Sequence, residues 1–204
     1  MRPVMLFSAL LLAMFGFSGS VRAQAVEQAL VDRATLTLQE MMGPADNTGD
    51  AKALLRNAKG VMICPRVFRA GFIVGGQFGD CVLAARDGGG SWSSPAFYNL
   101  VSGSLGFQAG LQDAQVVMLI MTQKGLNAML DSQFKFGAEA GVAFATLGRS
   151  IEGATTAAVG ADIVTIARTR GLFAGITLEG ALLSADSDKM RAYFGREMAA
   201  QQVV

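Results

Sequence analysis

The sequence predicts an α+β fold: a largely antiparallel sheet, curled or barrel-like, with N-terminal, middle and C-terminal helices. Three observations support this prediction. Helical periodicity is confined to both ends and one short middle segment. Strand-like apolar runs fill the remainder without helices between them, which disfavours parallel βαβ units. Glycines recur inside those runs, as in residues 171–180, and glycines within strands typically mark bulges or close backbone approach.

Residues 1–23 are predicted to be a secretory signal peptide, with cleavage after Ala23 or, alternatively, after Ala25. Arg2 supplies the positive n-region, and residues 4–17 form an uncharged apolar h-region. This run is shorter than the roughly 20 residues of a membrane-spanning helix, which favours a cleaved leader over a retained anchor. Residues 24–204 then form a single domain, and we expect secretion across the inner membrane to the periplasm or envelope.

The charge of the mature chain argues against nucleic-acid binding. Cleavage after Ala23 removes Arg2 and Arg22, which leaves 15 Lys and Arg against 16 Asp and Glu. A net charge of −1 provides no bulk attraction to phosphate backbones. The mature chain keeps two cysteines, Cys64 and Cys81, which an oxidising compartment would allow to form a disulfide. The alternative is two buried free thiols.

The first helix is expected over residues 24–42, because apolar residues recur there at helical spacing. Its polar face is acidic on balance, which favours a core-covering helix over a membrane-touching one. A second helix is predicted over residues 50–59, with Gly60 as its C′ residue.

Strands are expected in the middle of the chain, beginning with residues 61–64, which Pro65 ends. Residues 70–78 and 81–86 are predicted to pair through a hairpin at Gly79-Asp80. Further strands are expected over residues 96–105, 106–111, 114–121, 162–169 and 172–183. Thr122 is a predicted cap for a helix over residues 123–130. A last helix should start at Ser184 or Ser187 and end at Gly195.

No catalytic constellation is visible in the sequence. The absence of histidine removes the commonest general base and metal ligand, and it excludes a Ser-His triad. Residues 103–110 have the glycine content of a phosphate-binding loop but lack its Gly-Lys-Ser/Thr ending. The acids Glu152, Asp162 and Glu179 are not paired in sequence. We therefore expect neither an enzyme nor a bound cofactor or metal.

Several separated motifs, in one order, resemble the SYLF domain over roughly residues 54–194. They are Ala58-Lys59-Gly60, Gly71-Phe72, Trp92-Ser93-Ser94-Pro95, residues 103–110 with Gln108, and Gly171-Leu-Phe-Ala-Gly-Ile-Thr-Leu-Glu-Gly180. This is the lipid-binding family that includes yeast actin-patch proteins and many bacterial exported proteins. The resemblance implies membrane-lipid binding, with phosphoinositides as the favoured ligands of eukaryotic members.

One departure from the family pattern bears on the ligand. Eukaryotic members usually have Ser-Tyr-Ser before Lys-Gly-Leu-Phe-Ala-Gly, whereas residues 166–170 here read Ile-Ala-Arg-Thr-Arg. Arg170 stands at the family lysine, so the cation is kept, but the tyrosine is absent. An exported bacterial protein would rarely meet phosphoinositides, so another anionic phospholipid is the expected ligand. Actin binding, known for some eukaryotic members, is not carried over to this chain.

We therefore expect a non-catalytic lipid-binding protein of the bacterial cell envelope that contacts anionic phospholipid headgroups. Cations attract such headgroups, and aromatic side chains bury themselves among them. The candidate contacts are Lys59, Arg66, Arg69, Arg168 and Arg170, with Trp92, Phe97 and Phe173 as apolar contacts. The alternative is a structural or protein-interaction module of the envelope, whose protein partner the sequence does not name.

Overall fold

The computed structural model describes residues 18–43, 49–71, 74–105, 110–137, 141–146, 160–171, 178 and 180–204. The described helices are α2 (Ser18–Met41), α3 (Gly49–Asn57), α4 (Gln123–Leu130), α6 (Ser187–Phe194) and α7 (Ala200–Val203). The long strands are β1 (Gly60–Gly71), β2 (Val74–Ala85), β3 (Ala96–Leu105), β4 (Gly110–Ile120) and β7 (Ile163–Gly171). The short strands are β5 (Gln133–Lys135), β6 (Val142–Thr146) and β8 (Leu182–Ala185).

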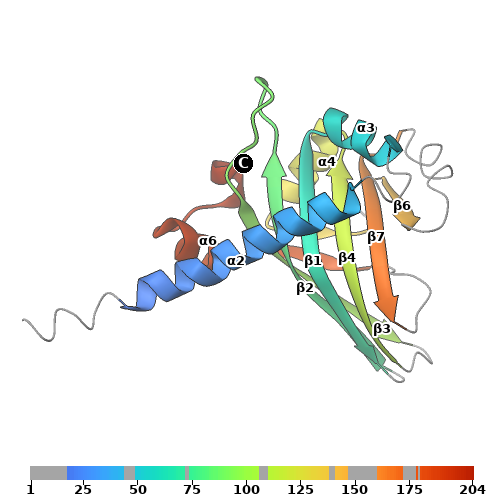
Figure 1. Ribbon diagram of the computed structural model, residues 1–204, viewed down its shortest axis with the longest axis horizontal. Coiled ribbons are helices and arrows are strands. Elements are labelled where there is room, and N and C mark those ends of the chain that lie inside the picture. Colours follow the sequence, from blue (N-terminus) through green and yellow to red (C-terminus); the bar gives the residue numbers. More distant parts are fainter. Residues whose placement is uncertain are drawn as a thin grey trace, which may run out of the picture.

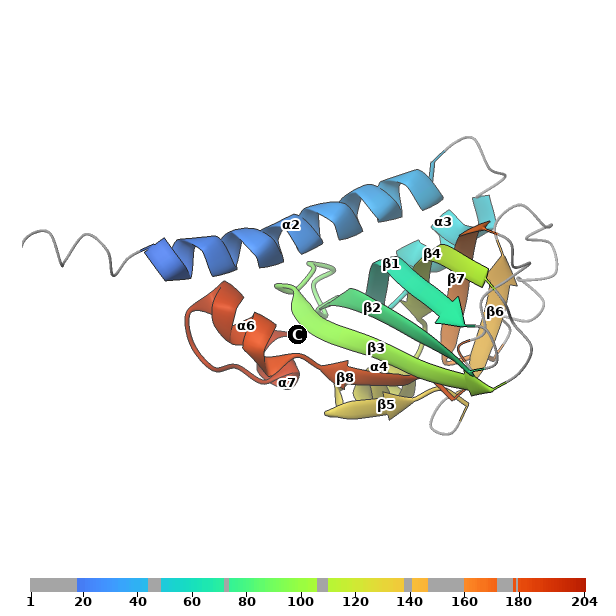
Figure 2. The same ribbon diagram turned by 90° about the horizontal axis from the view of Figure 1, so that it is seen from below.

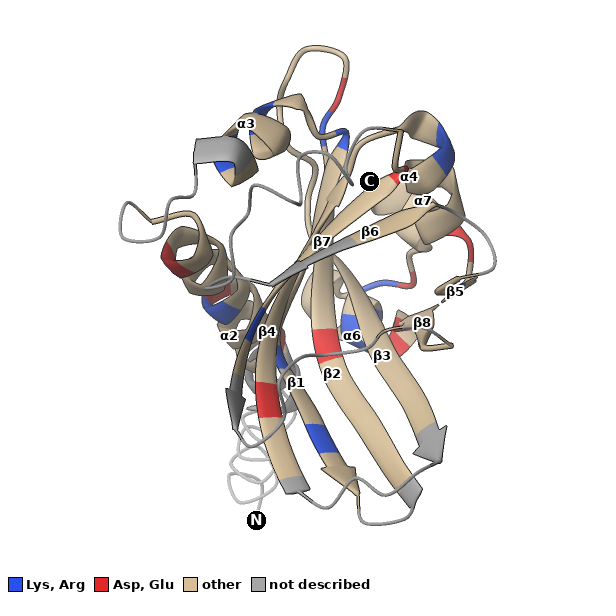
Figure 3. Ribbon diagram, turned by 90° about the vertical axis from the view of Figure 1, so that its right-hand side faces the viewer, with Lys and Arg blue, Asp and Glu red and all other residues tan. Residues whose placement is uncertain are grey.

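The strands form one eight-stranded sheet in the order β5-β8-β3-β2-β1-β4-β7-β6. Every described pairing is antiparallel except that of β6 with β7. The sheet curls strongly (Figure 3), and α2 crosses one face while α4 lies behind the other (Figure 1). The predicted α+β class, with a largely antiparallel curled sheet, is therefore confirmed.

The predicted break at Pro65 is wrong, because β1 continues through it. Between Ile63 and Arg66, β1 has one residue more than β2, and the same irregularity appears against β4. Such a bulge tolerates a proline, which has no amide hydrogen for the ladder. The predicted hairpin at Gly79-Asp80 is also wrong, since β2 runs through both residues. Gly79 instead allows close approach: a Cβ there would lie 2.9 Å from the Arg66 carbonyl oxygen.

The predicted helices are present, with corrections at their ends. α2 begins at Ser18, inside the predicted leader, whose residues 1–17 lie outside the described part of the chain. Gly60 opens β1 rather than ending α3. Thr122 caps α4 as predicted, by accepting a hydrogen bond from the Gly125 amide. No helix among the described residues is long and apolar enough to span a membrane.

The C-terminal helix α6 is capped by Asp186, not by Ser184 or Ser187. The Asp186 carboxylate accepts a hydrogen bond from the Lys189 amide, and its negative charge suits a helix N-terminus. Gly195 ends the helix in the left-handed conformation, as predicted. The strand predicted over residues 172–183 lies largely outside the described residues, within which Gly180 occupies a turn with φ of 74°.

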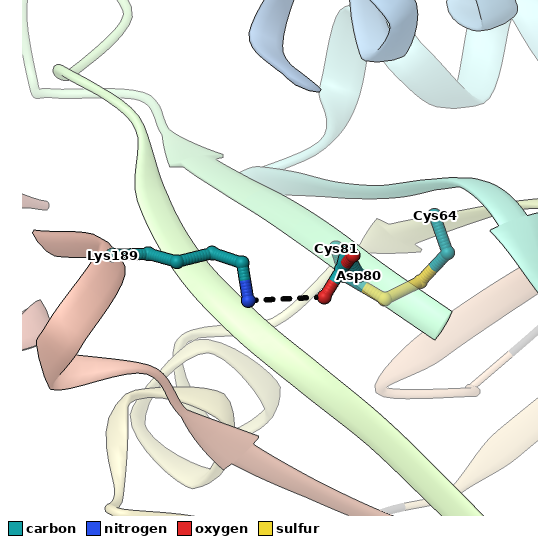
Figure 4. The surroundings of a disulfide bond; sticks show 4 residues. All are labelled: Cys64, Asp80, Cys81 and Lys189. Carbon is teal, nitrogen blue, oxygen red and sulfur yellow. Dashed lines mark ion pairs between the residues drawn. A yellow bond between two sulfur atoms is a disulfide. The ribbon is translucent and has the colours of Figure 1, made fainter. Parts of the chain in front are cut away.

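The core includes a disulfide between Cys64 and Cys81, which were left by the sequence as either a bridge or two free thiols. The two residues join β1 to β2 at the bulge, and both are fully buried. Figure 4 shows the bond beside Asp80, the neighbour of Cys81 in β2. The covalent link fixes the pairing of β1 with β2 where the hydrogen-bond ladder is irregular.

We expect replacement of both cysteines by alanine to lower the free energy of unfolding by about 3 kcal/mol, because the unfolded chain then regains the entropy of an open loop. Urea unfolding of residues 24–204, followed by circular dichroism, measures this change. A reducing agent should destabilise the wild-type protein and leave the double variant unaffected. Identical unfolding midpoints for the oxidised and reduced wild-type protein would contradict a structural role for the disulfide.

Asp162 fastens β7 to the start of α4. Its carboxylate accepts hydrogen bonds from the Thr122 hydroxyl at 2.6 Å, and from the Lys124 ammonium and the Gly141 amide at 3.1 Å each. Thr122, Gly141 and Lys124, in that order of importance, lower the pKa of Asp162 from 3.8 to about 2. Because the pKa of Asp162 is lower in the folded than in the unfolded state, its ionised carboxylate stabilises the protein at pH values above the unfolded-state pKa. This contribution disappears as the pH falls through the folded-state pKa of about 2.

Asp162→Asn should therefore destabilise the protein at neutral pH, and its difference from the wild type should shrink as the pH falls from 4 to 2. Thermal unfolding at a series of pH values measures the difference. Asp188→Asn, at an exposed position of α6, is the control and should give a small difference at every pH. If the difference in thermal stability between Asp162→Asn and the wild type stayed constant across this pH range, the lowered pKa of Asp162 would be refuted.

Candidate binding cleft

A cleft of about 1130 Å³ lies between α2 and the sheet face that α2 crosses. Figure 2 shows the helix running above the strands, with α6 below its first half. One wall consists of α2 residues between Leu30 and Glu40, and the floor comes from β1, β2, β3, β4 and β7. The cleft is therefore bounded by the first helix and by the centre of the sheet.

An apolar row crosses the floor of the cleft. It consists of Phe68, Phe78 and Val101, which are direct neighbours across β1, β2 and β3. Phe78 is 58% exposed and Val101 is 45% exposed. A Cβ at Gly76 would lie 3.0 Å from the Phe78 ring, so this glycine leaves room for the ring beside β2. On the opposite wall, Leu36 is 57% exposed. Clustered exposed apolar side chains of this kind typically mark a binding surface.

Arg66 and Asp113 form a two-point ion pair beside the apolar row. Arg66 Nε lies 2.8 Å from Asp113 Oδ1, and a terminal guanidinium nitrogen lies 3.1 Å from Oδ2. The hydrogen bond to Asp113 raises the pKa of Arg66. The guanidinium also lies 5.6 Å from the centroid of the Phe68 ring. Both charged groups remain open to solvent, so a bound ligand can reach them.

The end of α2 is attached to the sheet by polar contacts with Glu40. Gln115 Nε2 donates to Glu40 Oε2 at 3.2 Å, and an Arg168 guanidinium nitrogen donates to the Glu40 carbonyl oxygen at 3.4 Å. The charges of the described lining residues balance: the bases are Arg33, Arg66 and Arg168, and the acids are Glu40, Asp80 and Asp113. The cleft as a whole therefore has no excess of either sign.

Lys189 of α6 forms an ion pair with Asp80, which lines the cleft. Its ammonium lies 3.0 Å from Asp80 Oδ1 (Figure 4). It also lies 3.1 Å from Asn99 Oδ1 and pairs with the largely buried Asp186. Burial alone would lower the pKa of Lys189, but the hydrogen bonds to Asp186 and Asp80 raise it. Burial likewise opposes ionisation of Asp186, yet its bonds to Lys189 and Asn99 lower its pKa. The cluster therefore stays ionised and anchors α6 to β2 and β3.

Two of the predicted cations, Arg66 and Arg168, line the cleft. Arg69 is only 8% exposed and faces the opposite side of β1 from Phe68, which corrects the prediction of a surface cation there. Arg170 pairs in backbone register with Asp113, but its side chain is not described. Phe173 lies outside the described residues.

The other predicted contacts lie elsewhere. Phe97 is fully buried, with its ring centroid 5.2 Å from that of Tyr193, so it is a core residue rather than a lipid contact. Trp92 is exposed and lies under the Arg86 guanidinium, 4.5 Å from the ring centroid. Lys59 is exposed beside it, since its carbonyl oxygen accepts from the Arg86 amide. Arg86 follows Phe78 by eight residues, roughly 25 Å along an extended strand, so these residues are remote from the cleft.

Sequence reasoning missed the apolar row and Leu36. Phe78 has the same apolar character as a core residue, and no local signal separates it from the buried Phe97. No metal centre was predicted, and among the described residues no group of three or more acids or cysteines is arranged to hold a metal ion. The described cleft also lacks a histidine, because the chain has none.

Lys189→Met should lower the free energy of unfolding by about 2 kcal/mol, because it leaves the largely buried Asp186 carboxylate without its cation. Arg191→Met on the same helix removes two exposed ion pairs, with Asp188 and Glu197, and should cost less than about 1 kcal/mol. Urea unfolding at neutral pH measures both changes. Equal effects of the two substitutions would contradict the anchoring role of Lys189.

Comparison with known proteins places these features in a family. Residues 101–204 match the Ysc84 family model, described as "Las17-binding protein actin regulator". The chain is 28% identical to SH3 domain-containing YSC84-like protein 1 of Xenopus laevis, over 81% of this chain and 50% of that protein. It is 31% identical to an SH3 domain-containing protein of Schizosaccharomyces pombe, over 84% of this chain and 39% of the relative.

A third relative is LAS seventeen-binding protein 3 of Saccharomyces cerevisiae, 28% identical over 74% of this chain and 33% of the yeast protein. The chain thus spans between a third and a half of these three relatives. The Saccharomyces cerevisiae relative is named as a binding protein, and none of the three is named as an enzyme. No solved structure matches the chain. The family match covers half of the sequence, confirms the SYLF resemblance of its motifs, and shows that this chain belongs to the Ysc84 family.

Proposed function

We propose that this protein is a non-catalytic lipid-binding protein of the bacterial cell envelope that contacts anionic phospholipid at a membrane surface. The observation that carries the proposal is the exposed apolar row, flanked by Leu36 and by Leu111, which is also exposed. Leu111 lies two residues from Asp113 in β4 and therefore on the same face. The predicted signal peptide supports the location, and the family match supports a binding role.

The energetic terms indicate how such a contact would work. Burying an exposed Phe, Leu or Val side chain contributes roughly 1.5–3 kcal/mol, whereas a basic side chain near an anionic surface contributes about 1 kcal/mol. Phe78, Val101 and Leu111 would therefore supply most of the affinity. Arg66 and Arg168 would add the preference for anionic headgroups, weakened by the acids beside them.

A protein-interaction module is the second candidate, favoured by the family description, which names Las17 as a partner of family members. In this case the apolar row would face a protein instead of a membrane. Actin binding is not part of either proposal, and its absence in this chain stays a prediction. Crosslinking in the envelope that recovers one protein partner, together with failed lipid binding, would favour this second candidate.

Liposome flotation of residues 24–204 tests lipid binding, with vesicles of phosphatidylcholine alone or mixed with phosphatidylglycerol. We expect stronger binding to the mixed vesicles. Leu111→Glu should reduce the vesicle affinity about tenfold, a change of about 1.4 kcal/mol. The substitution replaces an apolar contact by a negative charge, which has the same sign as the anionic headgroups. Val26→Glu, at an exposed apolar position of α2 outside the cleft lining, should have little effect.

The contribution of the arginines is tested through the salt dependence of the same binding. Arg66→Ala with Arg168→Ala should weaken binding to the anionic vesicles and reduce its sensitivity to salt, since two cations no longer face the headgroups. Lys135→Ala, an exposed lysine of β5, is the matched control. Absence of binding to both vesicle types would overturn the proposed function.

A further inference from the structure

The interior of the cleft has the dimensions of an acyl-chain site. Its volume of about 1130 Å³ slightly exceeds the range of roughly 300–1,000 Å³ that is typical of ligand pockets. The α2 wall extends from Leu30 to Glu40, roughly 15 Å at the rise of an α-helix. This length equals half of the roughly 30 Å hydrocarbon core of a bilayer, which is the depth that one layer of acyl chains occupies.

Apolar side chains lie on both sides of the cleft, among polar ones. Leu30 and Leu36 of α2 line the cleft, one buried and one exposed, and the helix wall between and beyond them carries Arg33, Thr37 and Glu40. The apolar row of Phe68, Phe78 and Val101 forms the facing floor. A lipid headgroup alone would leave these surfaces in contact with water, whereas an acyl chain would cover them on both sides.

The charges at the cleft match a zwitterionic headgroup. Arg66 and Asp113 lie side by side and open to solvent, so a phosphate can pair with the guanidinium while an ammonium group pairs with the carboxylate. Arg33 and Glu40 offer a second base and acid on the helix wall. Because the described lining residues carry equal numbers of bases and acids, an anionic headgroup gains no bulk attraction inside the cleft.

We propose that this cleft binds a single-chain zwitterionic phospholipid as a monomer, with its acyl chain between α2 and the apolar row and its headgroup at Arg66 and Asp113. This inference rests on the proposed lipid-binding function and identifies a ligand class for the interior of the same site. Membrane contact uses the outer edge of the apolar row and Leu111, whereas the monomer occupies the space beneath Leu36.

The test is isothermal titration of residues 24–204 with lysophosphatidylcholine below its micelle-forming concentration. We expect one molecule of lysophosphatidylcholine bound per chain. Its affinity should change less than about twofold when added salt shortens the Debye screening length severalfold. Lysophosphatidylglycerol, which has an anionic headgroup, should bind no more tightly. Binding of the anionic compound alone, with a steep salt dependence, would overturn the zwitterionic assignment.

Matched variants locate the bound chain. Leu36→Glu should lower the affinity for lysophosphatidylcholine at least about tenfold, because a carboxylate would replace an apolar contact opposite the apolar row. Val26→Glu, 61% exposed on the same helix but outside the lining, should leave the affinity unchanged. Val101→Glu and Leu111→Glu form the corresponding pair on the sheet, of which only Val101 lines the cleft. Unchanged thermal midpoints establish that the four variants are folded.

Comparison with flotation separates the two proposals. Vesicle binding without binding of the monomer, or equal effects of Leu36→Glu and Val26→Glu on monomer affinity, would overturn the cleft assignment alone. Monomer binding without flotation would overturn the membrane-surface function and leave the cleft occupied as proposed. A dimer in solution that Leu36→Glu dissociates would identify a second copy of the chain as the occupant, and this outcome would also overturn the lipid assignment.

Discussion

The extra residue in β1 is the constraint on which the two faces of the sheet depend. In a regular strand, residues two apart share a face, so Cys64 and Arg66 would point the same way. The bulge between Ile63 and Arg66 breaks this alternation, so that Cys64 is buried in its disulfide while Arg66 lies open to the cleft. The bulge also determines which face of the sheet each later residue of β1 occupies, including Phe68 on the cleft floor. The disulfide fixes the strand pairing next to the irregularity, so the core and the cleft are specified by the same short segment.

The attachment of α2 leaves the cleft open while the helix stays in place. Glu40 holds the end of the helix to Gln115 and Arg168 on the sheet, and Tyr193 of α6 donates to Gln28 nearer its beginning. Between these contacts the helix covers the sheet incompletely, so Phe78 remains exposed. Exposed apolar surface of this kind gives no stability to an isolated chain, which is the physical reason for regarding it as a binding feature.

The fold class and the main helices were predictable because their signals are local, whereas the disulfide depends on the pairing of β1 with β2, which the sequence left open. Thr122 is a good N-cap wherever it precedes a helix, and Gly195 ends one for the same conformational reason. The hairpin assigned to Gly79-Asp80 failed because glycine is equally suited to a turn and to a strand that passes close to a bulge. Arg69 was misassigned because its face depends on the extra residue in β1, a property of strand pairing that residue types do not encode.

The family match and the geometry constrain different parts of the function. Membership in the Ysc84 family indicates a binding role, but it does not decide what lies between α2 and the sheet. The apolar row connects the two proposed sites, because its exposed edge is continuous with the covered floor of the cleft. An acyl chain that leaves a membrane at Leu111 would therefore pass over Phe68 to Phe78 and Val101 in the cleft without a separate transfer through water. Surface contact and monomer binding would then be successive uses of one apolar surface. The charge of the lipid headgroup would affect the first step and have little effect on the second.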